Sequence, residues 1–217
     1  MFAVVFEVEP KRERYAEYLE IAARLRPALE GIDGFLANER FASRRRQGRL
    51  LSLSLWRDEK ALIRWRTLGV HHAAQQQGRT AIFADYRLRV GEVVADSGLA
   101  PGETLAVQRL DETATGATAL TITEALAAVD DLAAALALAG PGAAGLVDRE
   151  TFASIAGPPK TLLLAAWRDG AAAGRWRPPS PPATALRHRT VRVIRDYGMA
   201  ERREAPQYYP PVPGSGI

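Results

Sequence analysis

Two neighbouring histidines, His71 and His72, are the groups best suited to acid–base chemistry near neutral pH. A neutral imidazole accepts a proton from a weakly acidic group such as a phenol, so a histidine that faces a pocket can act as a general base. Adjacent side chains on a helix point about 100° apart, and at most one of the two can face a pocket squarely. On this helical segment, the residues expected to face the protein interior include Val70 and Ala74. His71 lies beside this inward face, whereas His72 lies nearly opposite it. We therefore predict His71 as the base; the alternative is a solvent-exposed pair of histidines.

Metal-dependent chemistry is not favoured by the spacing of the possible ligands. The third histidine, His188, lies far along the chain, and no carboxylate spacing around the histidine pair matches a metal site. The chain has no cysteine, which excludes disulfides, thiolate ligands and a cysteine nucleophile. We expect no metal and no cofactor.

Composition and charge are those of an ordinary globular protein. Of the 217 residues, 47% are hydrophobic and 25% are charged, and the net charge of +4 is too small to favour nucleic acid. The densest basic cluster, Arg44-Arg45-Arg46, precedes Gln47-Gly48 and is typical of a hairpin turn. No apolar run is long enough to cross a bilayer, and the N-terminus lacks the features of a signal peptide. We expect a cytoplasmic protein that binds neither nucleic acid nor membrane.

An internal repeat divides the chain into two related copies. Several residues match, without a gap, at a constant offset of 111 residues. They are the tripeptides Phe41-Ala42-Ser43 and Phe152-Ala153-Ser154, and the tryptophan pairs Trp56 with Trp167 and Trp65 with Trp176. The dipeptide Arg89-Val90 matches Arg192-Val193 at a shorter offset of 103, which indicates a loss of about eight residues in the second copy. Trp56 and Trp167 both end strands of alternating apolar residues, and we expect both in the core.

Each copy has the pattern of a β-α-β-β-α-β unit. In the first copy, Leu51, Leu53 and Leu55 alternate with Ser52 and Ser54, so this strand buries one face. The other strands are apolar runs of similar length, and the helices carry apolar residues at a helical period. We expect strands at 2–8, 35–43, 49–56 and 83–94, and helices between Pro10 and Gly31, at 59–66 after an Asp58 cap, and at 71–77.

The second copy follows the same order in a shortened form. We expect strands at 104–110, 146–154, 161–167 and 184–195, a long helix at 124–139 and a short one after Asp169. Thr123 is suited to cap the long helix, and Gly140-Pro141-Gly142 to end it. We therefore divide the chain into a first domain at 1–96, a shortened second domain at 103–197 and a proline-rich tail at 198–217. The tail is expected either to lie across another subunit through Tyr208 and Tyr209 or to be disordered.

Two such units solve a burial problem that one unit leaves open. An antiparallel sheet with helices on one face leaves its other face bare, and two units can bury these faces against each other. We therefore predict an α+β fold in which two βαββαβ repeats pack sheet to sheet within one chain.

The arrangement of these elements and of a few side chains resembles the antibiotic biosynthesis monooxygenase (ABM) family. The features that carry the resemblance are an aromatic residue at the end of the third strand (Trp56), an aromatic residue on the next helix (Trp65) and the segment His71-His72-Ala73-Ala74-Gln75. The likeness covers 1–96 well and 103–197 more loosely. It implies ferredoxin-like repeats that together form a dimeric α+β barrel, here from a single chain.

The resemblance also implies a site between the helix layer and the sheet of the first copy. A cofactor-independent monooxygenase of this family would hold a phenolic or polycyclic aromatic substrate in an apolar pocket, remove its proton and let the anion react with O₂. His71 would be the base and Phe83 a wall, whereas Trp65 would serve either as a wall or in plain packing. The other candidates for substrate binding are Asn38, Arg66, Gln75 and Tyr86. A homodimer of the fused pair is one arrangement open to such a chain.

Two other functions stay open at this level. The first is a non-catalytic small-molecule-binding or stress-related module, which is favoured because the second copy lacks the His-Gln segment. Such a module should have a filled core in both copies. An enzyme should have an apolar cavity in the first copy only. The second is a haem-binding or haem-degrading protein. The family's haem enzymes place the axial histidine ten residues after the pocket tryptophan, and this chain has Gln75 at that position. They also place an asparagine on the first strand where this chain has Glu7. Haem binding is therefore the third alternative.

Overall fold

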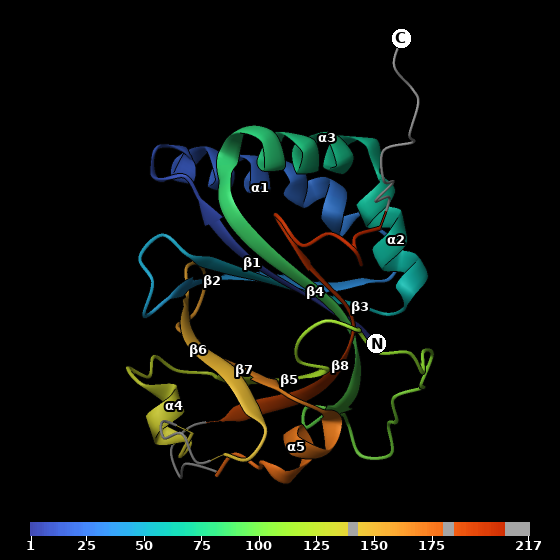
Figure 1. Ribbon diagram of the computed structural model, residues 1–217, viewed down its shortest axis with the longest axis vertical. Coiled ribbons are helices and arrows are strands. Elements are labelled where there is room, and N and C mark those ends of the chain that lie inside the picture. Colours follow the sequence, from blue (N-terminus) through green and yellow to red (C-terminus); the bar gives the residue numbers. More distant parts are fainter. Residues whose placement is uncertain (139–142, 180–184, 207–217) are drawn as a thin grey trace.

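Eight antiparallel strands close into a barrel in the computed structural model, which describes residues 1–138, 143–179 and 185–206 (Figure 1). The strands follow one another around the barrel in the order β1-β3-β2-β6-β7-β5-β8-β4. Their bounds are β1 Phe2–Pro10, β2 Phe35–Ser43, β3 Leu50–Trp56, β4 Phe83–Asp96, β5 Ala119–Ala125, β6 Leu146–Ser154, β7 Thr161–Trp167 and β8 Leu186–Gly198. The helices are α1 Tyr15–Glu30, α2 Glu59–Thr67, α3 Gly69–Gln77, α4 Leu132–Ala135 and α5 Gly170–Arg175, with single turns at Arg12–Arg14 and Gly78–Ile82.

The barrel consists of two four-stranded halves that share their edges. The first half contributes β4-β1-β3-β2 and the second contributes β8-β5-β7-β6, and the halves join where β2 pairs with β6 and β4 pairs with β8. Helices α1, α2 and α3 cover the outer face of the first half, and α4 and α5 cover that of the second (Figure 1). The predicted α+β fold, with two ferredoxin-like repeats packed into one intrachain barrel, is confirmed.

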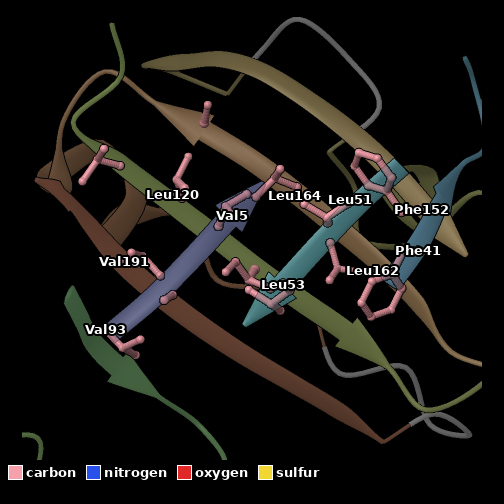
Figure 2. Close-up of a cluster of buried hydrophobic side chains, with 14 of the residues drawn as sticks. Val5, Phe41, Leu51, Leu53, Val93, Leu120, Phe152, Leu162, Leu164 and Val191 are labelled. Carbon is pink, nitrogen blue, oxygen red and sulfur yellow. The ribbon is translucent and has the colours of Figure 1, made fainter. Parts of the chain in front are cut away.

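The interior of the barrel is an apolar core to which both halves contribute. Along β3 the alternation predicted from the sequence places Leu51, Leu53 and Leu55 inside the barrel, and the intervening serines on the helix-covered face. Phe41 and Phe152, which the repeat pairs, are both fully buried in this core (Figure 2). Each half thus buries the sheet face that it would otherwise leave bare.

The paired tryptophans Trp56 and Trp167 lie on the outer faces of the sheets, beneath the helices, and are almost completely buried, as predicted. Each indole N–H is satisfied by a hydroxyl on the same face: Trp56 donates to Ser54 Oγ at 3.0 Å, and Trp167 donates to Thr121 Oγ1 at 2.9 Å. The two halves therefore anchor their helix layers in the same way.

Two predicted elements of the second half are wrong. The strand expected at 104–110 has no regular structure, and the long helix expected at 124–139 is replaced by the end of β5 and the four-residue helix α4. The β-branched residues Thr121, Ile122 and Thr123 suit a strand held between β7 and β8, and this pairing outweighs the helical tendency of the alanines that follow. Asp131, not Thr123, caps the short helix by accepting from Ala134 N.

The register of the last strands also corrects the length of the deletion. Phe2 of β1 lies opposite Glu92, and the corresponding Ala119 of β5 lies opposite Arg192. The last strands therefore match at an offset of 100 rather than 103, so the second copy is shorter by eleven residues between its third and last strands. The division of the chain into domains at 1–96 and 103–197 stays a prediction.

The segment after β8 returns to the first half of the same chain. Met199 N donates to Tyr86 O at 3.1 Å, and Arg202 donates to the hydroxyl of Tyr86. Ala205 is buried with Tyr18 of α1 in one apolar cluster. Tyr208 and Tyr209, through which the tail was expected to reach another subunit, lie outside the described residues. Within the described ranges, no helix has the length and apolar character needed to span a membrane.

Candidate functional site

A cavity of about 470 Å³ lies between helices α1–α3 and the outer face of the first half's sheet. Its walls come from β1, β2, β3 and β4 below and from the three helices above. The last strand of the second half and the segment after it complete the wall with Arg195, Tyr197, Arg202 and Pro206. All seven residues predicted for the site line this one cavity: His71, Trp65, Phe83, Asn38, Arg66, Gln75 and Tyr86.

His71 is held in a defined tautomer beside Trp65. The two rings stack with centroids 4.0 Å apart and an interplanar angle of 15°. His71 Nδ1 lies 2.9 Å from the backbone oxygen of Trp65, which can only accept, and 3.3 Å from the amide nitrogen of Gln75, which can only donate. The shorter contact favours the tautomer with the proton on Nδ1 and the lone pair on Nε2. Burial lowers the pKa of His71 to about 4, and the imidazole is therefore neutral at physiological pH.

His72 also lines the cavity, which differs from its expected position on the opposite side of the helix. The predicted inward face is wrong in part. Val70, which was expected to face inward, is 58% exposed, whereas His71, His72, Ala74 and Gln75 line the cavity. The residue pattern misled because α3 carries few apolar residues and uses polar ones on its inner face.

Aromatic rings form the apolar wall of the cavity. Phe83 contacts Phe6 and Tyr18 edge-on, with ring centroids 5.8 Å apart in both pairs, and Tyr86 lies 5.7 Å from Phe6. Gly78 permits this arrangement, because a Cβ atom at that position would lie 2.4 Å from Cε2 of Phe83. The wall offers planar, apolar contact surface to a ligand.

Polar groups of the sheet form the floor of the cavity. Asn38 donates to Ser52 Oγ at 3.0 Å and to the backbone oxygen of Leu53 at 3.1 Å. Ser52 and Ser54 both line the cavity, although we did not predict them as site residues. The signal was present in the sequence, because serines stand on a strand face that a helix covers and that is normally apolar.

Guanidinium groups give the cavity a positive character. It is lined by Arg40, Arg66, Arg79, Arg195 and Arg202. The acidic residue among the lining side chains, Glu59, forms an ion pair with Arg109 at 2.7 Å. Arg40 Nε and Arg66 Nη1 are buried and have no hydrogen-bond partner among the described residues. Nothing in the sequence placed Arg195, Tyr197 or Arg202 at the first copy's site, because the pairing of β8 with β4 brings them there.

The corresponding layer of the second half is filled. At the positions matching Ser52 and Ser54 stand Leu163 and Ala165, both fully buried against α4 and α5. Trp176 packs 5.8 Å from Trp167 and 5.4 Å from His188. A metal site is not seen either: within the described ranges, no three histidine, aspartate or glutamate side chains gather closely enough to bind an ion.

His188 serves this packing rather than a cavity. Its Nδ1 bonds to Thr123 Oγ1 at 2.8 Å, and burial, the largest cause, lowers its pKa to about 4. The predicted contrast between an open first half and a filled second half is therefore what the described residues show.

Comparison with known proteins identifies a relative that matches almost the whole chain and further matches to part of it. The family model for antibiotic biosynthesis monooxygenase matches residues 1–77. The "Jasmonate monooxygenase ABM" of Pyricularia oryzae is 39% identical over 221 residues, covering 98% of this chain and all of the relative. The uncharacterised protein YqjZ of Bacillus subtilis is 33% identical over 92 residues, 42% of this chain and 78% of its own length.

Solved structures agree on the architecture. An aldoxime dehydratase in complex with butyraldoxime superposes with a TM-score of 0.56 at 12% identity, covering 89% of this chain and 79% of that one. At this identity the likeness concerns the fold alone. The match to the Pyricularia protein extends over both halves of the chain, so the chain belongs to the antibiotic biosynthesis monooxygenase family.

Proposed function

We propose that this chain is a cofactor-independent monooxygenase that binds a phenolic or polycyclic aromatic substrate in the cavity of its first half. The observation that carries the proposal is a neutral imidazole with a free Nε2 lone pair in an aromatic-walled cavity, of which the second half has no open counterpart among the described residues. A non-catalytic module with two filled halves does not account for this asymmetry.

The proposed reaction begins with proton transfer from the substrate to His71 Nε2. The resulting anion gives one electron to O₂, and the substrate radical and superoxide combine to form a C–O bond. The peroxide then loses water and leaves a carbonyl group. One CH₂ and one O₂ become C=O and H₂O, so the substrate supplies all four electrons and no cofactor is required.

The cavity is suited to the charges that arise during these steps. The substrate anion lies near the imidazolium that it has just protonated, and this attraction raises the pKa of His71 for as long as the anion persists. Either Asn38 or Arg66 is the donor proposed to stabilise the charge that develops on the peroxide. Trp65 supports the base through the stacking and the backbone bond described above.

A second substrate class follows from the relationship to the Pyricularia protein. That protein is named for jasmonate, the anion of a carboxylic acid, and it matches the present chain over its whole length. The positively charged lining of the cavity favours an organic anion of this kind. Adding a hydroxyl group to jasmonate consumes two electrons from an external reductant, so this candidate is assayed with and without NADPH.

The proposal is tested by incorporation of labelled oxygen. Protein dialysed against EDTA is incubated under ¹⁸O₂ with a hydroxylated anthrone and, separately, with jasmonate, and the products are analysed by mass spectrometry. We expect one ¹⁸O atom in a quinone product with no added flavin, haem or metal. If neither substrate gives a labelled product although both still bind, the protein is a binding module and not a monooxygenase.

The role of His71 is tested on the same assay. His71→Ala should reduce turnover by about 10²- to 10⁴-fold, the range usual for a positioned base, and leave the unfolding transition in place. His188→Gln serves as the control, because His188 lies in the filled half and should not affect turnover. Unchanged turnover in His71→Ala would refute its assignment as the base.

A further inference from the structure

Buried arginines in this protein are normally paired with carboxylates. Arg89 pairs with Glu7, and Arg189 pairs with both Asp96 and Glu124. A guanidinium group removed from water needs such partners, since leaving its donors unmet costs free energy. The five arginines that line the cavity are less buried than these, with Arg79 exposed and the others half-buried, and none of the five forms an ion pair with any residue in the described ranges.

Three of these arginines, Arg66, Arg195 and Arg202, line the cavity together with Tyr197. Burial is the largest cause of the shift that raises the pKa of Tyr197 to about 12, and the charges of Arg66, Arg202 and Arg195 all act against that shift. Arg195 and Tyr197 are two residues apart on β8, so their side chains share the face of that strand that borders the cavity. Arg202 also lies over the Tyr197 ring, 5.9 Å from its centroid.

Arg66 is the member of this group with donors to spare. Arg202 donates to the hydroxyl of Tyr86, and Arg195 reaches the backbone oxygen of Glu204 at 3.5 Å. Arg66, on helix α2, has a buried Nη1 with no described partner. Its guanidinium therefore has one unmet donor in a cavity whose other lining residues are mostly apolar.

We propose that the cavity contains a carboxylate subsite, in which Arg66 binds the acid group of an amphipathic substrate and Arg195 and Arg202 add their charge. The inference rests on the proposed function in taking the cavity as the substrate site. A guanidinium group binds a carboxylate through two parallel hydrogen bonds, which also fix its orientation. The apolar body of the acid would then extend along the wall of Phe6, Phe83 and Tyr86 toward His71.

The subsite is built by both halves of the chain. Arg66 belongs to the first repeat, whereas Arg195 lies on β8 of the second repeat and Arg202 on the segment that follows it. The pairing of Leu88 with Tyr197 and of Val90 with Arg195 carries these residues onto the floor of the first half's cavity. The second repeat thus supplies charge to a site in its neighbour.

Calorimetric titration with matched acid and neutral ligands tests the subsite without requiring turnover. The probes are jasmonate with methyl jasmonate, and 1-naphthylacetate with 1-naphthylacetamide. The full-length protein should bind each acid at least about 10-fold more tightly than its neutral analogue. Arg66→Gln should weaken acid binding by about 10- to 100-fold and leave binding of the neutral analogues nearly unchanged. Arg66→Lys should restore part of the acid preference.

Two further variants locate the effect. Arg64→Gln, on the same helix but outside the cavity, should behave like the unmodified protein. Arg195→Gln changes a residue of the second repeat and should reduce the preference for the acid over its neutral analogue. Equal binding of acids and neutral analogues, equal weakening of both by Arg66→Gln, or no binding of either acid would overturn the subsite. Acid-selective binding without oxygen incorporation would support the subsite and refute the proposed monooxygenase activity.

Discussion

His71 and His188 occupy buried positions in different halves, and both remain neutral where an exposed histidine would begin to be protonated. In each case burial is the main cause that lowers the pKa to about 4. For His71 the consequence is a permanently available lone pair, and for His188 it is a neutral partner for Thr123. The same chemical state therefore supports a candidate base in one half and packing in the other.

The two histidines should make stability depend on pH below about 6.5. The unfolded chain binds protons at these residues from about pH 6.5 downward, whereas the folded chain does so only near pH 4, so acid favours unfolding. We expect each histidine to lower the free energy of unfolding by about 1 to 2 kcal/mol between about pH 7 and about pH 5. Urea titrations at both pH values measure this difference.

Matched variants assign the effect. His71→Gln and His188→Gln should each remove part of the pH dependence. The carboxylates with lowered pKa values, Glu7 and Asp96, do not interfere, because they are protonated only at lower pH. Identical pH dependence in the variants and the unmodified protein would contradict the assignment.

At the scale of elements, patterns that reflect burial predicted the structure well. The hairpin of β6 and β7 follows from two runs of strand length, and the short helix after Asp169 follows from a capping side chain. The strand at 104–110 and the helix at 124–139 were wrong because local composition carries no information on which segment pairs with β7 and β8. Residues on β8 were missed at the site for the same reason, since only the closed barrel brings them to the first half.

The outer face of one strand distinguishes the open half from the filled one. Ser52→Leu places in the first half the residue that the second half has at Leu163, and the added side chain projects into the cavity. We expect binding of the acid probes to weaken at least about 10-fold with no loss of stability, because Asn38 keeps its bond to Leu53 O. Calorimetry and thermal unfolding measure the two effects.

The reverse exchange is the control. Leu163→Ser should lower the free energy of unfolding by about 3 kcal/mol or more, because it leaves a void and buries a hydroxyl in a filled layer. Ligand binding should stay unchanged, since the cavity lies in the other half. Weaker binding in Leu163→Ser, or unaltered binding in Ser52→Leu, would show that the two layers do not differ as described.

At the scale of the whole molecule, reciprocal polar contacts join the halves where β2 meets β6. Glu39 of the first half accepts from Ser154 and pairs with Lys160, and Glu150 of the second half accepts from Ser43 and pairs with Arg49. The repeat relates each member of one set to a member of the other. The junction of β2 and β6 thus contains the same set of polar side-chain contacts twice, once from each half.

If the chain is cut after Gly102, the two fragments should therefore stay associated as one complex. The segment that follows is anchored on the first half, because the Glu92 carboxylate accepts from Gln108 N at 2.6 Å and Glu59 pairs with Arg109. We expect fragments 1–102 and 103–217 to co-purify as a one-to-one complex, and either fragment alone to self-associate through its bare sheet face and open edges. Light scattering measures both. Two stable, separate monomers would contradict the shared core.

Fusion changes what a substitution can do in this fold. In an assembly of two identical subunits, every mutation appears twice and must be tolerated in both environments. Here the two repeats can change independently. The helix layer of the second repeat is filled, and the last strand of that repeat lines the cavity of the first. Selection can therefore adjust ligand preference through Arg195 or Tyr197 on the second copy, without altering the helices that carry His71.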